Sequence, residues 1–213
     1  MTQASIVETA NGEAGTGGRQ RLLQAAAAEF AEHGFAGASI AAIAAGAGVG
    51  KSTVFHHFDS KQDLYLTVIA EAAAEFGRRL DDMLQSVDDP EACLRAFQRQ
   101  HLAHITSNSQ VATLVLRELQ DAGSERAVSL VREVLAPNFR RLTSYLERAL
   151  EAGTIRAGVD CQAAAMTLFA ANVFYFQNRA MLAQLPEGRL AENADAFASA
   201  VSDLVFRGLA KDS

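Results

Sequence analysis

The chain has 213 residues, 49% of them apolar, and a net charge of −6 from 19 Lys/Arg and 25 Asp/Glu. This length is sufficient for a small head and a larger helical domain, each with its own core. No apolar run approaches the about 18 residues of a membrane-spanning helix, and the polar start lacks a secretion signal, so we expect a cytoplasmic protein with no membrane partner.

The first 18 residues are rich in Gly, Thr, Ala and Glu, a composition that predicts a disordered tail. An amphipathic helical pattern then runs from Arg21 to His33. The link after this pattern contains Gly34, Phe35 and Gly37, and its glycines indicate a break before the next helix.

Residues 39–58, SIAAIAAGAGVGKSTVFHHF, contain two short helical patterns joined by the three residues Ala47–Val49. The apolar residues at helical spacing are Ile40, Ile43 and Ala44 in the first pattern, and Val54 and Phe58 in the second. Two short helices with a tight, glycine-bearing turn are typical of a DNA-reading helix-turn-helix.

The second pattern has a polar outer face. At about 100° per residue, burial of Val54 and Phe58 turns other side chains toward solvent. The predicted outward set is Ser52, Thr53 and His56, with Phe55 and His57 on its flanks. None of the five carries a negative charge that would repel phosphate, so this helix is the candidate groove reader.

The same segment contains GVGKST, which partly matches a phosphate-binding loop. The motif requires Gly five residues before Gly50, where this chain has Ala45, and a buried strand, where this chain has an Ala-rich helical pattern. A nucleotide-hydrolysing enzyme that uses Lys51 is therefore a disfavoured alternative.

The order of these elements resembles the DNA-binding domain of the tetracycline-repressor (TetR) family of bacterial transcription regulators. The resemblance covers about Arg19 to Leu66 and rests on Ile43-Ala44, Ala47-Gly48-Val49, Lys51, Thr53, Phe58 and Ser60-Lys61. It implies an all-α fold, with an N-terminal three-helix helix-turn-helix domain and a C-terminal helical ligand-binding and dimerisation domain. We expect a tail at 1–18, the DNA-binding domain at 19–65 and the helical domain at 66–213.

Three residues depart from the family pattern. Gly50 stands where the family usually has a capping Ser, Ser52 where it often has Gly, and Phe55 where it typically has a phosphate-binding Tyr. Phe55 cannot donate that hydrogen bond, so its DNA contact would be apolar. These departures bear on the operator sequence and leave the expected fold unchanged.

The expected DNA contacts divide into two kinds. Ser39, Lys51 and Lys61 are predicted to hold phosphates, and the outward set with its two flanking residues is predicted to face the major groove. Residues 19–62 hold four Lys/Arg and three Asp/Glu, a net charge of +1. Bulk charge is thus insufficient, and binding needs Arg19, Arg21 and the two lysines placed at phosphates.

The remaining chain reads as helices with clear stops. The expected helices are Ser60 to Ser86, Asp89 to Thr106, Gln110 to Gln120, Ser124 to Glu151 with a kink at Pro137 and an end at Gly153, Asp160 to Leu185, and Leu190 to Leu209.

The helix from Asp160 to Leu185 is apolar on nearly every face, which predicts contact with both its own core and a second subunit. The last helix has an apolar stripe at the same spacing. Proteins of the resembled family dimerise through these two helices, so we expect a homodimer. A purely intramolecular core is the alternative.

We expect an effector pocket in the helical domain. The candidate lining residues are Leu116, Phe139, Phe169, Asn172, Val173 and Phe176. This set is aromatic-rich with few polar groups, which suits a small apolar or aromatic effector. Ordinary core packing is the alternative for each residue.

Other polar residues favour structural roles. His101 and His104 have a spacing that suits a metal, but no further ligand lies at motif spacing, and we expect no cofactor. Cys93 and Cys161 are far apart and read as reduced thiols, with a redox switch as the alternative. No catalytic constellation can be assembled.

We therefore predict a regulator, a repressor by preference, that binds palindromic operator DNA as a homodimer and is released by an effector. The resemblance implies that the helix beginning near Lys61 swings when the effector binds. A ligand-independent activator or architectural DNA-binding protein is the alternative.

Overall fold

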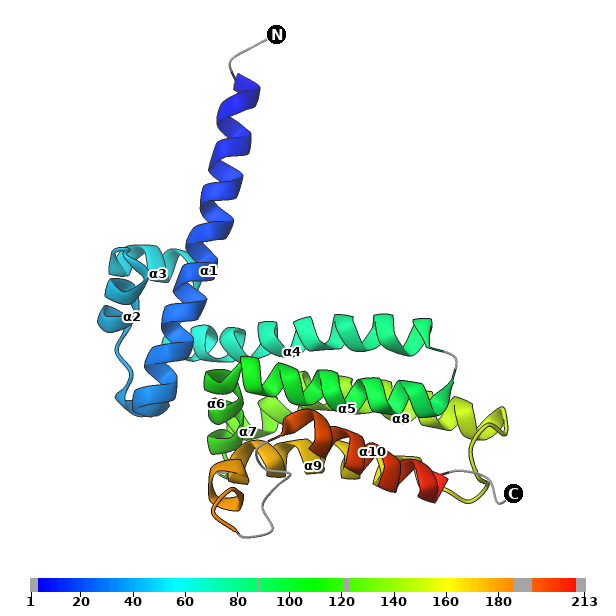
Figure 1. Ribbon diagram of the computed structural model, residues 1–213. Helices are drawn as coiled ribbons and strands as arrows, with labels where there is room; N and C mark the ends of the chain where they lie inside the picture. The colour runs from blue at the N-terminus through cyan, green and yellow to red at the C-terminus, as the bar shows by residue number, and fades with distance from the viewer. Residues whose placement is uncertain (1–3, 88, 121–122, 186–192, 210–213) are drawn as a thin grey trace. The chain divides into compact units, whose positions relative to one another are not determined.

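A computed structural model describes residues 4–87, 89–120, 123–185 and 193–209, which form helices and no strand (Figure 1). This confirms the predicted all-α fold. The helices are α1 (Ala4–Gly37), α2 (Ile40–Ala47), α3 (Lys51–His57), α4 (Lys61–Ser86), α5 (Pro90–Ser107), α6 (Ser109–Gln120), α7 (Glu125–Ser129), the π-helix η1 (Leu130–Leu135), α8 (Ala136–Glu151), α9 (Cys161–Leu182) and α10 (Ala194–Leu209).

The chain forms two compact units. Unit 1 comprises Met1–Ala72 and Gln110–Ala127, and unit 2 comprises Ala73–Ser109 and Val128–Ser213. Helix α4 contributes its first half to unit 1 and its second half to unit 2. The segment Gln110–Ala127, which the sequence assigns to the helical domain, therefore packs with the N-terminal helices.

Helix α1 differs from the expected disordered tail. The structure has residues 4–18 as the beginning of this helix. No proline precedes Pro90, so no residue in this segment lacks an amide donor or fixes a helix-breaking φ. The predicted break near the other end is present, because Gly34 has φ 70° and ψ 175° within α1.

The core of unit 1 joins α1, the two short helices and the start of α4. Its most buried side chains are Leu22, Ala26, Phe30, Ile43, Val54, Leu64 and Ile69. The ring of Tyr65 lies edge-on to Phe30 at 5.0 Å and to Phe35 at 5.2 Å between centroids. Aromatic contacts thus fix the link after α1 against α4.

A buried carboxylate fastens α6 into unit 1. Glu118 is 6% exposed, and it accepts hydrogen bonds from Tyr65 Oη at 3.1 Å, Ser124 Oγ at 3.1 Å and Arg126 Nε at 3.0 Å. Arg126 also lies 4.5 Å from the ring centre of Phe35. Burial and the adjacent carboxylate raise the pKa of Tyr65, so the phenol stays a proton donor. These contacts explain why residues 110–127 cluster with the head.

Local capping sets the helix boundaries that the sequence predicts. The Asp89 carboxylate accepts from the amides of Glu91 and Ala92, and the Asp160 carboxylate accepts from those of Gln162 and Ala163. Gly153, at φ 66°, ends α8, where the Thr154 amide reaches the Ala149 carbonyl at 2.9 Å. The last expected helix begins at Ala194, and residues 190–192 lie outside the described part of the chain.

The irregularity expected at Pro137 takes the form of the π-helix η1 immediately before it. The amide of Ala136 donates to the carbonyl of Val131, five residues back. Proline lacks an amide hydrogen and its ring clashes with the carbonyl four residues earlier, so the wider turn removes both conflicts. Helix α8 then resumes with normal geometry.

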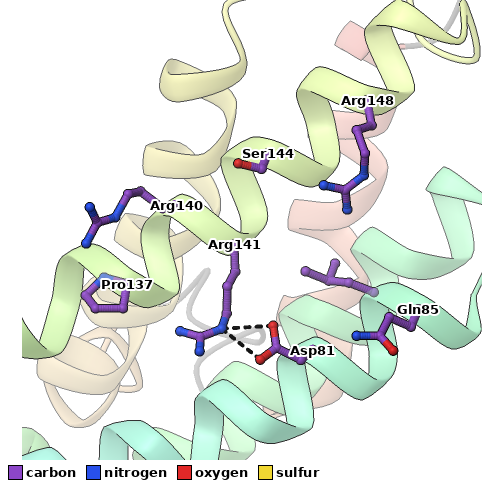
Figure 2. Close-up of a pocket in the computed structure, with 8 residues that line it drawn as sticks. Asp81, Gln85, Pro137, Arg140, Arg141, Ser144 and Arg148 are labelled. Atoms are coloured by element: carbon purple, nitrogen blue, oxygen red, sulfur yellow. Dashed lines mark hydrogen bonds and ion pairs between the residues drawn. The ribbon is translucent and has the colours of Figure 1, made fainter.

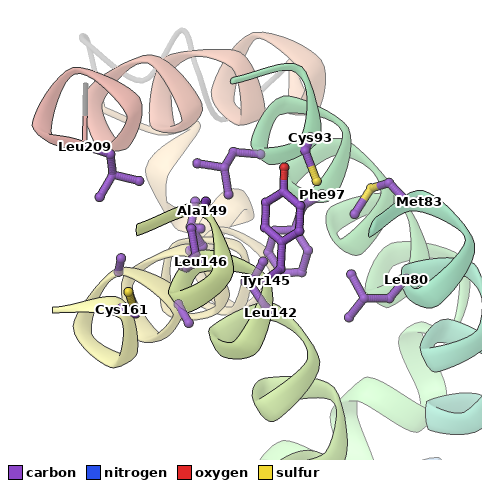
Figure 3. Packing of buried hydrophobic residues seen from close by; sticks show 14 of the residues in the cluster. Leu80, Met83, Cys93, Phe97, Leu142, Tyr145, Leu146, Ala149, Cys161 and Leu209 are labelled. Atoms are coloured by element: carbon purple, nitrogen blue, oxygen red, sulfur yellow. The ribbon is translucent and has the colours of Figure 1, made fainter. Parts of the chain in front are cut away.

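The core of unit 2 is an apolar cluster formed by α4, α5, α8, α9 and α10 (Figure 3). Leu94, Leu142, Leu146 and Leu168 are fully buried in it. Arg141 on α8 and Asp81 on α4 form an ion pair beside this core (Figure 2).

Candidate functional site

Helix α3 presents the face that the sequence predicts. Val54 is 1% exposed and Phe58, which ends the helix, is 3% exposed. Lys51, Ser52, Phe55 and His56 are exposed, and Thr53 and His57 are half-buried. Helices α2 and α3 contain no acidic residue. The outward positions therefore agree with the expected groove-reading set, whose contact with DNA stays a prediction.

The turn before α3 depends on glycine. Gly48 has φ 70° and ψ 33°, a left-handed conformation that a residue with a Cβ rarely adopts. The Gly48 amide donates to the Ala45 carbonyl at 3.1 Å, and the Val49 amide donates to the Ala44 carbonyl at 2.9 Å. The tight turn lets the apolar faces of α2 and α3 meet, as a helix-turn-helix requires.

Ser39 caps α2. Its Oγ accepts from the Ala41 amide at 3.2 Å, and its own amide donates to Glu29 Oε1 at 3.0 Å. The side chain is exposed and its hydroxyl hydrogen is available. The structure thus gives Ser39 a capping role, and its phosphate contact stays a prediction.

Lys61 has structural partners that the sequence did not indicate. Its Nζ donates to the carbonyls of Ala36 at 3.3 Å and Ala38 at 3.0 Å, and lies 4.8 Å from the ring centre of Phe35. Two of the three ammonium hydrogens are therefore used within unit 1. Lys51 is exposed, so the two lysines, expected to act alike, have different surroundings.

The other two expected phosphate-binding cations also differ. Arg19 is held by an ion pair with Glu71 and by the ring of Phe58, 5.5 Å from its guanidinium carbon. Arg21 is exposed. Arg21 and Lys51 are thus exposed cations of the head, whereas Arg19 already has an intramolecular carboxylate partner.

The effector residues proposed from the sequence divide between the units. Leu116 lies in unit 1, and the other five lie in unit 2. Phe139 and Phe169 have ring centroids 6.2 Å apart, and Phe169 also contacts Phe97 at 5.0 Å. Val173 and Phe176 are half-buried on α9. The structure therefore brings Phe139 and Phe169 together in one aromatic region of unit 2.

A polar group lies inside this aromatic region. Asn172, which is 0% exposed, donates through Nδ2 to the Gln98 carbonyl at 3.1 Å, to Gln98 Oε1 at 2.9 Å and toward His101 Nδ1 at 3.0 Å. The ring of His101 lies 4.8 Å from that of Phe169. Asn172, predicted as a pocket residue, is therefore the centre of a buried hydrogen-bonded cluster.

This cluster is not saturated. Among the described residues, Gln98 Nε2 and Asn172 Oδ1 are buried without a hydrogen-bond partner. An unpaired buried donor or acceptor costs about 1–3 kcal/mol, so a ligand that paired with both would recover that cost. The sequence analysis missed Gln98, although its spacing of four residues from Leu94 marks it as an inward position.

The two histidines expected to be partly exposed are buried. Burial lowers the pKa of His101 to about 3, with a smaller effect from His104, whose own pKa burial also lowers. Both rings contact Phe76, with centroids 5.1 Å away. No group of three or more His, Cys, Asp or Glu side chains within the described residues is arranged to hold a metal.

The cysteines and the membrane question have simple structural answers. Cys93 and Cys161 are both buried as free thiols, and burial raises the pKa of each. Over the ranges that the structure describes, every helix is too short or too polar to span a bilayer. Residue Lys51 follows α2 and a turn, so the strand that a phosphate-binding loop requires is not there.

Comparison with known proteins identifies both parts of the chain. Residues 22–68 match the family model of bacterial regulatory proteins of the tetR family, and residues 90–205 match that of the tetracyclin repressor-like C-terminal domain. The transcriptional repressor NicS of Pseudomonas putida is 25% identical over 90% of this chain and 92% of its own length.

Two solved structures share the fold. FadR of Bacillus subtilis in complex with stearoyl-CoA has a TM-score of 0.76 and 20% identity, covering 89% of this chain and 98% of its own. The complex of SmeT with triclosan, a repressor of Stenotrophomonas maltophilia, has a TM-score of 0.73 and 22% identity, covering 92% and 93%. The similarity thus extends over both units.

Acid should destabilise this protein through His101. Below the ordinary histidine pKa of 6.5 the unfolded chain binds a proton that the folded chain takes up only near pH 3. The stabilising contribution is therefore complete above about pH 6.5 and is lost as the pH falls toward 3. Urea unfolding at pH 7.5 and pH 5 should show a smaller pH difference for His101→Phe than for the wild type. The exposed-site control His33→Gln should keep the wild-type difference, and an unchanged difference in His101→Phe would refute this assignment.

Substitutions in the head should separate base reading from phosphate binding. Thr53→Ala or His56→Ala should cost roughly 1–3 kcal/mol of DNA binding and relax preference at particular base pairs. Lys51→Ala should weaken binding to all sequences and reduce the salt slope by about one for each phosphate that a subunit no longer neutralises. Lys61→Ala should also lower the melting temperature, because two carbonyls lose their donor. Equal effects of Thr53→Ala on every DNA sequence, measured by anisotropy titration, would contradict the base-reading role.

Proposed function

Because this chain belongs to the TetR family of bacterial transcription regulators and is a DNA-binding regulator, we propose that it represses transcription from a palindromic operator as a homodimer and is released by a small effector. The observation that carries the proposal is the exposed face of α3, which is free of acidic residues and rigidly held by Val54. Its relatives are named as regulators, which points away from an enzyme. Since the proposed target is bacterial DNA, the proposed site of action is the cytoplasm.

The homodimer is supported by an exposed apolar stripe on α9. Met166 and Met181 are each 61% exposed, Phe174 is 54% exposed, and all three lie on one helical face. Leu204 on α10 is 73% exposed. The opposite face of α9 packs in the core of unit 2, as expected for a helix apolar on nearly every face. A second copy would cover the exposed face with twofold symmetry.

We infer that the effector is mainly apolar, with a few polar groups. The support is the aromatic region around Phe169 in unit 2 and its two unpaired amide atoms, on Gln98 and Asn172. The fold neighbours FadR and SmeT were solved with stearoyl-CoA and triclosan, respectively, and both ligands have a large apolar part. Phe139 and Asn172 remain the leading contact residues, and Val173 and Phe176 are proposed at the margin.

Release requires that the effector bind the conformation with low DNA affinity more tightly than the other. Helix α4 is the proposed carrier, because it runs from unit 1 into unit 2 without interruption. A shift of its second half on effector binding would displace the first half and change the separation of the two α3 helices in the dimer.

Assembly is tested by Leu204→Arg. This change puts a charge into the proposed interface without touching a buried side chain, so we expect monomers in sedimentation velocity and loss of operator binding. Phe197→Arg is a poorer probe, because Phe197 packs on Tyr175 at 4.5 Å between ring centroids. Ser199→Arg, at an exposed position about 140° around α10, is the matched control and should stay dimeric. A wild-type protein that sediments as a monomer at micromolar concentration would refute the homodimer.

Effector release is tested by anisotropy titration of operator DNA with stearoyl-CoA and with triclosan as probes. At least one probe should stabilise the protein and lower its DNA affinity. Asn172→Leu should weaken this response while DNA affinity without the probe is retained, and Gln162→Leu, at an exposed position on α9, should respond as wild type. If probes stabilise the protein but leave DNA affinity unchanged, the ligand-independent alternative is favoured.

A further inference from the structure

A groove of about 340 Å³ lies between α4 and α8 within unit 2 (Figure 2). Its lining residues are Asp81, Leu84, Gln85, Pro137, Arg140, Arg141, Ser144 and Arg148. Three arginines and one carboxylate give the lining a net charge of +2, in a chain whose net charge is −6. No residue proposed above for DNA or effector binding lies among them.

The arginines share one side of α8. Arg140 and Arg148 are eight residues apart with Ser144 midway, so they lie on one ridge of the helix, and Arg141 lies next to them. Figure 2 shows the three guanidinium groups and the Ser144 hydroxyl along this side. Guanidinium groups bind phosphate oxygens in pairs, which makes such a row suited to a phosphoryl group.

Arg141 is held in place before any ligand binds. Its Nε donates to both oxygens of Asp81, at 2.9 and 3.0 Å, and its Nη1 donates to Asn138 Oδ1 at 3.2 Å. Asn138 is 8% exposed, and its Nδ2 donates to the Ala73 carbonyl at 3.1 Å. This chain of contacts fixes the guanidinium at the edge of α4.

Gly77 makes this arrangement possible. A Cβ added at Gly77 would lie 2.8 Å from Asn138 Oδ1 and 3.4 Å from the guanidinium of Arg141. Any side chain at this position would therefore push both groups away from α4. The close approach of α8 to α4 at Gly77 thus seats Asn138 and Arg141.

The other two arginines are available to a ligand. Arg140 Nε donates to the Ala136 carbonyl at 3.3 Å, and neither Arg140 nor Arg148 pairs with a carboxylate among the described residues. Both side chains are exposed. A purely structural ion-pair network would neutralise these charges, whereas here only Arg141 is neutralised.

The floor of the groove leads toward the apolar core. Leu84 lines the groove and also packs against the core cluster of unit 2, and Phe139 on α8 packs on the same cluster next to Phe169. A molecule with a phosphorylated head and an apolar tail therefore meets complementary chemistry along one path.

We propose that the groove binds the phosphate-bearing head group of an amphipathic effector, with Arg140 and Arg148 as the recruiting cations and Arg141 as the fixed one. The assignment of this head group to the effector rests on the proposed function. The binding of a phosphoryl group in the groove rests on the side chains alone.

The test compares three probes by isothermal titration calorimetry on the full-length protein: stearoyl-CoA, coenzyme A and stearate. The double variant R140Q/R148Q should weaken stearoyl-CoA and coenzyme A binding by roughly tenfold or more and leave stearate binding unchanged. The matched control R99Q/R132Q changes two exposed arginines of unit 2 outside the groove and should bind all probes as wild type. Raising the salt concentration should weaken coenzyme A binding in the wild type.

Gly77→Ala gives an independent check on the fixed arginine. It should weaken coenzyme A binding while the circular dichroism spectrum remains helical, and Ala74→Gly, at an exposed position one turn earlier on α4, should bind as wild type. Equal affinities of R140Q/R148Q and R99Q/R132Q for coenzyme A, or no binding of coenzyme A or stearoyl-CoA to the wild type, would overturn the groove proposal.

The two proposals fail separately. If coenzyme A binds through the arginines but stearoyl-CoA does not release operator DNA, the groove is supported and the release mechanism is refuted. If stearate alone binds and releases DNA, the release mechanism stands and the groove proposal is overturned. Binding of coenzyme A and not of the acylated probe identifies a free phosphorylated metabolite as the source of the head group.

Discussion

Burial of Val54 against α2 is the contact on which the DNA-facing surface depends. Helix α3 has seven residues, whereas an isolated helix needs about 12–15 to be even marginally stable in water. Its helicity must therefore come from tertiary packing, which the left-handed turn at Gly48 permits. Once Val54 and Phe58 point inward, the directions of Thr53 and His56 follow from helical geometry. The same apolar contacts that stabilise the head thus aim its polar residues.

The two units treat buried polar groups in different ways. In unit 1 the carboxylate of Glu118 has three donors, so a segment distant in sequence is locked to the head. In unit 2 the amides of Gln98 and Asn172 each keep an unpaired atom within an aromatic region. A saturated group rigidifies its surroundings, whereas an unsaturated one offers a ligand free energy that the folded chain has not recovered. The first arrangement suits a rigid DNA reader and the second suits a responsive domain.

Charge is used sparingly in the head and locally in unit 2. Arg19 and Lys61 direct their donors to Glu71 and to the carbonyls of the link, which leaves few free cations near α3. DNA binding must then rely on placement and on two copies of the head. In unit 2, Arg140 and Arg148 are without a carboxylate partner among the described residues, beside the neutralised Arg141. A local positive surface therefore exists in a chain that is acidic as a whole.

The sequence determined the features that depend on neighbours within about four residues. Asp89, Asp160 and Gly153 set helix ends because their hydrogen bonds reach only the adjacent turn, and the spacing of Val54 and Phe58 set the outer face of α3. The tail was an exception, since helix α1 extends through residues read as disordered. Tertiary structure alone decided the features that join distant residues: the partners of Lys61, the attachment of Glu118 to Tyr65, and the seat of Arg141 opposite Gly77. These contacts span 23 to 65 residues along the chain, and no local spacing encodes which distant group a side chain will meet when helices pack.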